Sequence, residues 1–364
     1  MPMKQTSRII STYSSDTFGV CSALFELGGM VVMHDASGCN GTYTTHDEPR
    51  WFDIDSMVYI SALTEMEAIM GDDEKLISDI ATAAEELHPK FIAIVGTPIP
   101  TMVGFDFQAV AALIEERTGI PSFGFAATGM NTYVHGVSMA LEILANHFVA
   151  DTGKRTENPS MNILGLTPLD FSMNGQAESI IQWATEQGYQ VLSSWAMGSN
   201  LEDIGRAGEA HLNLVVSAGG LKAAQVLEQR FGTPYLVGVP MDGKIESSDL
   251  PGDSIMVVGE GVYSLSLAYA LERSLGRGVR VICTTECDEH LLRPKDVLLR
   301  DEVEIEKALQ TAEIIIADPL YRPICPQGAR FVELPAESFS GRIYRKRIPN
   351  LVADFESFAK ELKA

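Results

Sequence analysis

The segment SIMVVGEGVYSLSLAYALERSLG (254–276) combines the two patterns that decide the fold class. Its first part, 254–259, is a short apolar run that predicts a buried strand. Its second part, 262–276, places apolar residues at helical spacing and stops at a glycine, which predicts a helix. A buried strand followed directly by a helix is typical of a parallel sheet that helices cover.

The same alternation recurs along the chain. Further strands are predicted at 29–34, 91–96, 161–166, 212–217, 279–284 and 313–318. Further helices are predicted at 72–88, 105–119 and 175–188. Apolar strands that alternate with helices indicate parallel sheets with helices on both faces. The predicted fold class is therefore α/β.

Two polar segments divide this alternation into three units. Residues 149–162 carry charges, Pro and Gly, and residues 240–254 are rich in Gly, Pro, Asp and Ser, so both are interpreted as linkers. We expect three Rossmann-like domains, at 1–150, 160–245 and 252–364, the last with a terminal helix. In such sheets ligands bind at the carboxyl ends of the strands, so a cleft between the domains is the expected site.

Composition limits the class of partner. The chain has 364 residues, is 46% hydrophobic and 21% charged, and carries a formal net charge of -22. This charge argues against nucleic acid or an anionic membrane as partner, because both require a positive surface. No stretch approaches the roughly 20 apolar residues of a membrane span, and the polar N-terminus lacks the apolar segment of a secretion signal. Five cysteines fit a reducing compartment, so we expect a cytoplasmic protein.

Cys39 is the cysteine whose setting is most suggestive of chemistry. It lies in the turn SGCNG, between Gly38 and Gly41, after the predicted strand 29–34. Backbone N–H groups in such a turn stabilise a thiolate, and small residues leave room for a bulky inorganic group. A small buried thiol in a tight turn is the alternative.

The other cysteines give weaker signals. Cys21 lies on an apolar helix face and is interpreted either as a core residue or as a ligand. Cys283, Cys287 and His290 form C-x3-C-x2-H, which is at most half of a zinc site. Cys325 lies between two prolines and has no evident role.

The turn at Gly259 and Gly261 is a second candidate. It joins a strand to a helix as in a dinucleotide-binding fingerprint, but Ser264 occupies the third glycine position. A glycine turn at a helix N-terminus binds anionic groups, and it is also a common tight connection. No Walker-type phosphate loop is present, so we expect no nucleotide on this chain.

Several segments in this order resemble the nitrogenase component 1 type oxidoreductase family. They are HDASGCNG (34–41), ALTEMEAIMGDDEKLISDI (62–80), HPKFIAIVGTPIPTMVGFDFQAVA (88–111), SFGFAATGMNTYVHGVSMALE (122–142), HLNLVVSAGGLKAAQVLEQRFGTPYL (211–236) and FVELPAESFSGRIY (331–344). The resemblance covers nearly the whole chain and its three-domain plan. It implies a dimer or pseudo-symmetric heteromer that receives electrons from a separate ATP-hydrolysing iron–sulfur reductase.

The family's ligand positions are only partly kept. Family members typically hold an iron–sulfur cluster at the subunit interface through three cysteines of the first domain. Cys39 matches the middle one, whereas the first falls near Ser14 or Ser15 and the third at Pro98. Proline offers no ligand through its side chain.

The residues that hold the large nitrogenase cofactor are also not kept in this sequence. The cysteine and histidine that hold it in nitrogenase match Ser217 and Pro335 here. The resemblance is therefore not to a nitrogenase catalytic subunit.

The resemblance nevertheless implies a cluster shared between chains. A [4Fe–4S] cluster requires four ligands, usually thiolates. Two copies of Cys39 and two of Cys21 on a twofold axis would supply them, and a related partner subunit is the alternative. The proposed metal ligands are thus Cys39 and Cys21.

The substrate site is expected between the domains and near this cluster. His34, His46 and Arg50 flank the Cys39 turn and are candidate proton donors for a reduction, with Gly38, Gly41, Gly259 and Gly261 as candidate cofactor-binding positions. The alternative for each polar residue is a satisfied structural position.

Three functions follow from this sequence. The leading hypothesis is an iron–sulfur reductase subunit that reduces an unidentified small substrate. The alternatives are a scaffold or carrier for a metallocluster, and a metal-free binding module that keeps only the fold.

Overall fold

The computed structural model describes residues 8–10, 14–36, 38–41, 43, 47–245, 249–250 and 254–363, apart from the side chains of Cys39 and Lys363. Thirteen strands of this part of the chain form three sheets, and every strand pair is parallel. The fold is therefore α/β with Rossmann-like sheets.

The first sheet has the order β2-β1-β3-β4, the second β6-β5-β7-β8 and the third β11-β10-β9-β12-β13. The strands are β1 (Met30–Met33), β2 (Met57–Ile60), β3 (Ile92–Val95), β4 (Ser122–Phe125), β5 (Ser160–Leu164), β6 (Gln190–Ser194), β7 (Leu212–Val215), β8 (Tyr235–Val237), β9 (Ile255–Gly259), β10 (Val279–Cys283), β11 (Val297–Leu298), β12 (Ile314–Ala317) and β13 (Arg330–Glu333). In each sheet the strand order reverses once, between β1 and β3, between β5 and β7, and between β9 and β12. Ligands of open α/β sheets bind at these switch points.

The helices lie on both faces of the sheets. They are α1 (Asp16–Leu24), α2 (Glu65–Met70), α3 (Asp73–Leu87), α4 (Pro98–Val103), α5 (Phe107–Thr118), α6 (Tyr133–His147), α7 (Pro168–Phe171), α8 (Gln176–Glu186), α9 (Leu201–Gly205), α10 (Leu221–Phe231), α11 (Gly261–Leu275), α12 (Glu302–Leu309), α13 (Glu337–Ser340) and α14 (Phe355–Lys363). All four helices and all seven strands predicted from the sequence are present.

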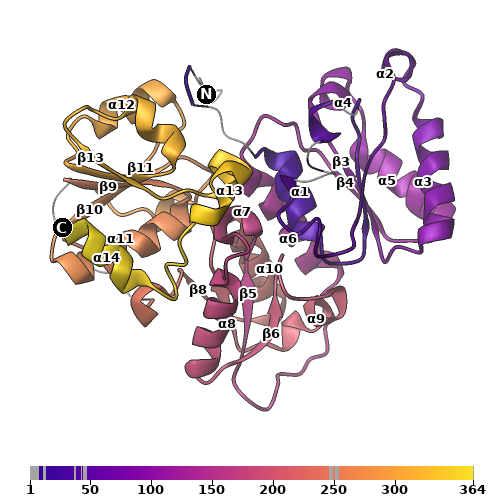
Figure 1. The fold of residues 1–364 in the computed structure, drawn as a ribbon. Helices are drawn as coiled ribbons and strands as arrows, with labels where there is room; N and C mark the ends of the chain where they lie inside the picture. The colour runs from indigo at the N-terminus through magenta and orange to yellow at the C-terminus, as the bar shows by residue number, and fades with distance from the viewer. Residues whose placement is uncertain are drawn as a thin grey trace.

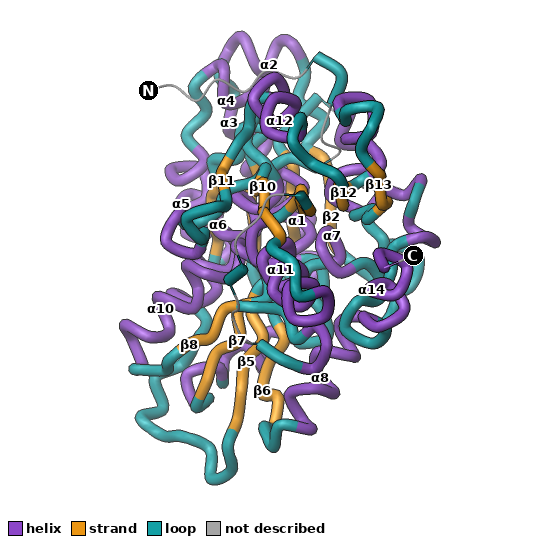
Figure 2. Tube along the Cα trace, turned by 90° about the vertical axis from the view of Figure 1, so that its left-hand side faces the viewer, coloured by secondary structure: helices purple, strands orange, loops and turns teal. Residues whose placement is uncertain are grey.

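The three sheets form three lobes, and α1, α6, α7 and α13 lie where the lobes meet (Figure 1). From the side, the strands of the second sheet occupy the lower end of the molecule, below those of the first and third sheets (Figure 2). The buried apolar clusters cross these divisions. One cluster contains both Val31 of β1 and Val215 of β7, and another contains both Ile163 of β5 and Val257 of β9. The lobes therefore share cores.

The contact between α1 and α6 depends on two glycines. A Cβ on Gly136 would lie 1.8 Å from the carbonyl oxygen of Asp16, and one on Gly19 would lie 2.0 Å from that of Tyr133. Real Cβ atoms do not approach backbone this closely, so any side chain at either position would push the helices apart. Glycine allows α1 and α6 to touch backbone to backbone.

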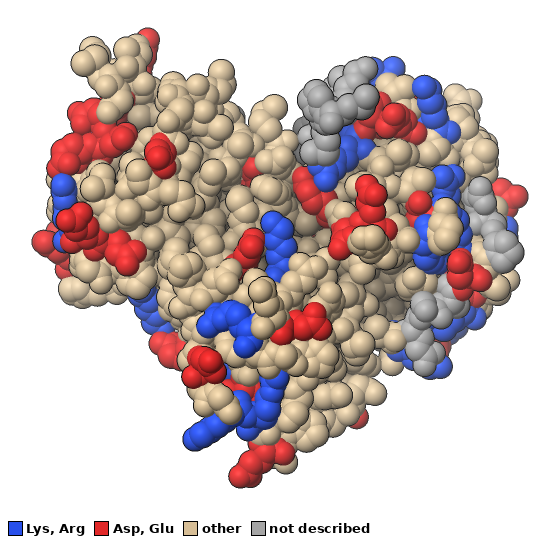
Figure 3. Space-filling model, turned by 180° about the vertical axis from the view of Figure 1, so that it is seen from behind, with Lys and Arg blue, Asp and Glu red and all other residues tan. Residues whose placement is uncertain are grey.

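The surface reflects the acidic composition. Seen from behind, acidic side chains gather on the side of the first lobe, whereas lysines and arginines are interspersed with acids over the rest (Figure 3). Across the described residues, every helix is too short or too polar to cross a membrane.

Candidate functional site

The Cys39 turn lies at the switch point of the first sheet, after β1. Cys39 belongs to the short 3-10 turn Cys39–Gly41, and its side chain lies outside the described part of the chain. Asn40 fixes the turn by donating from Nδ2 to Asp35 Oδ2 at 2.7 Å, and Thr97 Oγ1 donates to Asp35 Oδ1 at 3.1 Å. Side chains that follow β1 and β3 thus hold the turn in place.

The flanking glycines face open space. A Cβ on Gly38 or on Gly41 would meet no described atom within 4 Å. Packing against the described residues therefore does not require glycine at either position.

The other family cysteine positions lie at the same edge of the first sheet. Ser15 is the N-cap residue of α1, and Ser14 before it is buried, with a hydroxyl that has no partner among the described residues. Pro98 occupies the first turn of α4, against Gly129, where a Cβ would lie 2.8 Å from the proline ring. Neither position offers a thiolate.

Cys21 has no exposed surface and belongs to the apolar cluster of the first and second lobes. Burial and the nearby Glu48 carboxylate raise its pKa well above the usual range of a thiol. Within this chain, Cys21 packs as a core residue, so ligation of an interface cluster would require α1 to move.

Arg50 is fully buried in an ion-pair network. Its Nε donates to Glu48 Oε1 at 2.6 Å and its Nη1 to Glu26 Oε1 at 2.9 Å. Nη1 also donates to the carbonyl oxygen of Ala196 at 2.6 Å, which joins the first lobe to the second. A guanidinium held in this way has a structural role and is not exposed to a substrate.

His34 lies directly after β1 and is also buried. Its Nδ1 shares a hydrogen bond of 2.8 Å with Ser61 Oγ, and its ring packs against that of Phe105. Burial lowers the pKa of His34 to about 4, so the imidazole is neutral near neutral pH. His46, the second histidine of the predicted set, lies outside the described residues.

The turn at Gly259 and Gly261 lies at the switch point of the third sheet, between β9 and α11. Glu260 caps α11, because its carboxylate accepts from the backbone N–H of Tyr263 at 2.7 Å and from that of Ala218 at 2.9 Å. A carboxylate therefore occupies the place that a phosphate would take at this helix N-terminus. An anionic cofactor would have to displace it.

Asp170 of α7 is a neighbour of Glu260. Tyr133, the first residue of α6, donates from its hydroxyl to Asp170 Oδ1. Burial and the nearby Glu260 raise the pKa of Asp170 well above its usual range, and burial also raises that of Glu260. Two carboxyls in one buried site do not both ionise readily, so the pair retains a proton.

Asp318 completes a group of three acids at this junction. It follows β12 and accepts from the backbone N–H of Ala336 at 2.9 Å and from Ser340 Oγ at 2.8 Å. Burial raises its pKa as well. Among the described residues, no lysine or arginine is among the largest causes of the pKa shifts of these three carboxyls.

A small cavity of about 40 Å³ lies between these acids. Its lining includes Asp170, Glu260, Tyr263, Asp318 and Pro335. It has room for one to a few water-sized molecules, since a water needs about 10–15 Å³ of such volume. The cavity therefore fits a very small substrate, or a larger one only after the lobes separate.

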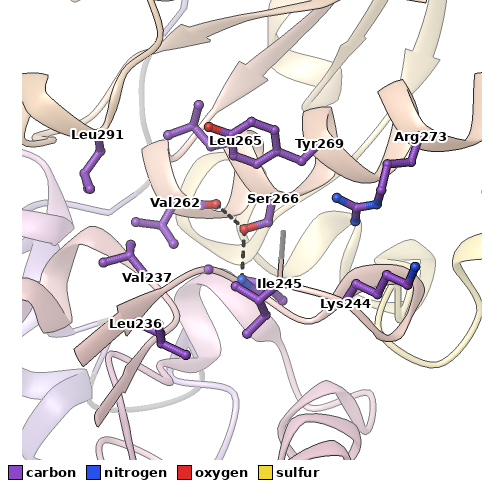
Figure 4. Close-up of a pocket in the computed structure, with 12 residues that line it drawn as sticks. Leu236, Val237, Lys244, Ile245, Val262, Leu265, Ser266, Tyr269, Arg273 and Leu291 are labelled. Carbon is purple, nitrogen blue, oxygen red and sulfur yellow. Dashed lines mark hydrogen bonds between the residues drawn. The ribbon is translucent and has the colours of Figure 1, made fainter. Parts of the chain in front are cut away.

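Two wider cavities lie nearby. One of about 310 Å³ is lined by Val134 of α6, Lys222 of α10 and Cys287. Another of about 280 Å³ lies between β8 and α11, where Ser266 Oγ accepts from Val239 N at 2.8 Å and donates to Val262 O at 2.7 Å (Figure 4). Its rim carries Arg273, which is paired with Asp242 at 2.9 Å.

The residues at the junction of Asp170, Glu260 and Asp318 differ in how well the sequence predicts them. No motif singles out Asp170, Asp318 or the hydroxyl of Tyr133, although both acids follow interior strands. Glu260 lies between the two glycines of a candidate turn. Its position at the start of a helix, directly after a buried strand, was the signal from which a functional role could have been predicted.

An iron–sulfur cluster does not fit the described residues of this chain alone. They contain no group of three or more His, Cys, Asp or Glu side chains arranged to hold a metal ion, so Cys283, Cys287 and His290 do not form a metal site. The positions that the resemblance assigns to two family cysteines, near Ser14 or Ser15 and at Pro98, carry no thiol, and Cys21 is enclosed in the core. A cluster bound through Cys39 would need ligands from another chain.

The model of the nitrogenase component 1 type oxidoreductase family matches residues 15–245. The chain belongs to this family. The match includes the Cys39 turn and the first two sheets, and it confirms the resemblance drawn from the sequence motifs.

Curated relatives of this nitrogenase component 1-like chain have different roles. The nitrogenase iron-molybdenum cofactor biosynthesis protein NifE of Clostridium pasteurianum is 28% identical over 180 residues, which cover 48% of this chain and 38% of the relative. A light-independent protochlorophyllide reductase component of Nostoc punctiforme is 26% identical over 191 residues, covering 49% of this chain and 37% of the relative. The matched region thus spans well under half the length of either relative.

Solved structures extend the similarity of fold to the whole chain. The structure of nitrogenase Cp1 at pH 5 superposes with a TM-score of 0.68 at 17% identity, covering 99% of this chain and 89% of that one. The third sheet, beyond the family match, therefore also belongs to the shared architecture.

Proposed function

We propose that this chain is a component 1-like reductase subunit, which accepts electrons from an ATP-hydrolysing iron–sulfur partner and reduces a small molecule where the three lobes meet. The observation that carries this proposal is the cavity at that junction, which is lined by the buried carboxyls of Asp170 and Glu260. Burial raises the pKa of both carboxyls. A reduction by single electrons consumes protons, and this buried pair holds one.

The proton source follows from the hydrogen bonds. Asp170 accepts from the hydroxyls of Tyr133 and Thr167, the latter at 3.4 Å. Glu260 accepts from two backbone N–H groups at 2.7 Å and 2.9 Å, so the ionised form of Glu260 is the better stabilised of the two. The shared proton therefore resides mainly on Asp170. Asp170, which lines the cavity, would donate this proton to the bound substrate.

Electron entry is proposed at the Cys39 turn. Cys39 would ligate a [4Fe–4S] cluster shared with a second copy of the chain or with a related subunit. Such a cluster would accept and pass on single electrons. Cys21 is the weaker second ligand because of its burial.

The first test is the iron and acid-labile sulfide content of anaerobically purified protein. About two irons per chain would indicate one four-iron cluster shared by a symmetric dimer. Cys39→Ala should lose this iron, whereas Cys325→Ala, which changes a half-buried loop thiol, should keep it. Loss of iron in Cys39→Ala but not in Cys21→Ala would point to a heteromeric partner.

A second candidate function is a scaffold or carrier for a metallocluster precursor. It is favoured by the relative whose name gives a role in cofactor biosynthesis. This function predicts bound metal that is released to an acceptor protein, without ATP-dependent oxidation of a reduced iron–sulfur partner. Absence of iron under all anaerobic conditions would contradict both functions and leave a metal-free binding module.

A further inference from the structure

Two cysteines outside the proposed cluster site lie against the same helix start. Cys283 ends β10, and Cys287 follows four residues later in the loop after it. A Cβ on Gly261, the first residue of α11, would lie 2.5 Å from the Sγ of Cys287 and 3.2 Å from the Sγ of Cys283. One atom position would therefore touch both sulfurs, and glycine leaves it empty.

Each thiol also donates to a nearby carbonyl. Cys283 Sγ donates to Thr285 O at 3.5 Å, and Cys287 Sγ donates to Asp288 O at 3.6 Å. The two thiols are close enough for Cys283 to raise the pKa of Cys287. Both sulfurs therefore lie side by side in the reduced form.

The two cysteines differ in access. Cys283 has no exposed surface, whereas Cys287 is half-buried and lines the cavity of about 310 Å³ between α6, α10 and the loop. Lys222 and His135 line the same cavity. A small reagent that enters this cavity reaches Cys287 first.

We propose that Cys283 and Cys287 are a redox-active dithiol, which closes to an intrachain disulfide when a small disulfide of the glutathione class enters this cavity. The Cys287 thiolate attacks one sulfur of the oxidant, which forms a mixed disulfide and releases one thiol. The Cys283 thiolate then attacks the Cys287 sulfur and releases the second thiol. The chain loses two electrons and two protons, and the oxidant gains them.

The loop between the two cysteines gives this reaction a structural consequence. Glu286 accepts from the Thr132 hydroxyl at the N-cap of α6, and it pairs with Arg300 at 3.2 Å. Formation of the disulfide draws together the two ends of the loop that carries Glu286. The redox state of the pair therefore acts on a contact between the third and first lobes, and this inference does not depend on the proposed cluster.

The rate should depend on pH. The adjacent Cys283 thiol, burial and the neighbouring acids Glu260 and Asp288 all raise the pKa of Cys287. The thiolate is the attacking species, so oxidation should be slow near neutral pH and should become faster as the pH rises through the alkaline range.

The test is thiol mapping of the native protein after incubation with excess oxidised glutathione. Tryptic peptide 281–295 contains both cysteines and no other. We expect this peptide to become two hydrogen atoms lighter and resistant to alkylation, and to recover on reduction. A stable glutathione adduct on Cys287 beside a free Cys283, or two thiols that both remain alkylatable, would overturn the proposal.

Matched variants resolve the order of steps. Cys283→Ser should stop at the glutathione adduct of Cys287, because the second thiol is missing. Cys287→Ser should leave Cys283 unmodified, because it is enclosed. Cys325→Ser, in a separate loop, should oxidise at 281–295 as the wild type does. Equal reactivity of Cys283 and Cys287 in the single variants would contradict the proposed entry through the cavity.

Discussion

The Cys39 turn and the Asp170–Glu260 junction both lie at switch points of parallel sheets, but their buried acids differ in how they are paired. Around the turn, the buried acid Glu48 has a cation, Arg50, and Asp35 accepts from Asn40 and Thr97. At the junction lie three buried carboxyls, and no described lysine or arginine is among the largest causes of their pKa shifts.

This difference separates buried acids that are paired with a cation from buried acids that are not. A buried carboxylate paired with arginine stays ionised and contributes to the geometry of the site. A buried carboxyl without a cation keeps its proton and gives it up when a base or a developing negative charge arrives. The acids around the turn are therefore held by an ion pair and hydrogen bonds, whereas burial at the junction favours the protonated carboxyl.

Breaking the paired network should have the largest effect. Arg50→Met leaves Glu48 buried without its counter-charge, so we expect a loss of about 3–5 kcal/mol in the free energy of unfolding, measured by urea denaturation. The double variant with Glu48→Gln should recover part of this loss. Arg117→Met, which removes an exposed pair with Glu74, should change stability little. If Arg50→Met lowered the free energy of unfolding as little as Arg117→Met does, the Arg50 network would be dispensable for stability.

The connection between the two regions is tested at the helix crossing. Gly136→Ala places a methyl group 1.8 Å from a backbone oxygen of α1, so we expect a loss of about 3 kcal/mol. Gly205→Ala, whose added Cβ would lie 3.6 Å from the nearest atom, is the control and should be tolerated. Thermal unfolding of both variants measures the difference. Equal melting temperatures would mean that α1 and α6 separate without cost.

His34 should make the turn region sensitive to acid. Its pKa is about 4 when folded and 6.5 when unperturbed, so as pH falls the unfolded chain binds the proton first. Stability should therefore drop between about pH 6.5 and pH 4, by about 2–3 kcal/mol from this group. His34→Gln should flatten that slope, and the exposed His290→Gln should not. An unchanged slope in His34→Gln would assign the acid sensitivity to other groups.

The junction should show the opposite dependence on pH, with a smaller effect. The raised pKa of Asp170 means that the folded chain keeps a proton that the unfolded chain has lost. Its contribution to stability is present at low pH and is lost as pH rises above the usual carboxyl range. Asp170→Asn should be more stable than the wild type at alkaline pH, by about 1 kcal/mol. The variant Glu178→Gln, at an exposed position, should follow the wild type. If the stability of the wild type, Asp170→Asn and Glu178→Gln changed with pH in the same way, this would contradict a buried protonated pair.

The interior strands of the sheets were predictable, and the edge strands were not. All seven predicted strands, β1, β3, β5, β7, β9, β10 and β12, have neighbours on both sides. The six that were missed, β2, β4, β6, β8, β11 and β13, each lie at an edge. Interior strands are buried on both faces and therefore form continuous apolar runs, whereas edge strands such as Tyr235–Val237 are partly exposed and lack that signal.

The site was less predictable than the sheets. The Cys39 turn was recognisable because a cysteine between glycines after an apolar run is unusual. The acid cluster was not, since Asp170, Glu260 and Asp318 come from separate parts of the chain and are united only by the packing of the second and third lobes. Their raised pKa values arise from that burial, which no local pattern encodes.

The glycine contact of α1 with α6 sets a fixed spacing between the two regions. α1 begins beside the Cys39 edge, where Ser14 N also donates to Ser338 O at 3.1 Å, and α6 begins at Tyr133 on the junction. With backbone against backbone, neither helix can slide without the other. Both helices begin at the same end of the pair, because Ser15 and Thr132 form an antiparallel bridge. If electrons enter beside the start of α1 and protons leave from Tyr133, opening of the lobes would not alter the distance between the two events. The rate of turnover would then depend on the driving force for electron transfer and on the supply of protons. It would not depend on a movement that brings the Cys39 turn closer to the Asp170–Glu260 junction.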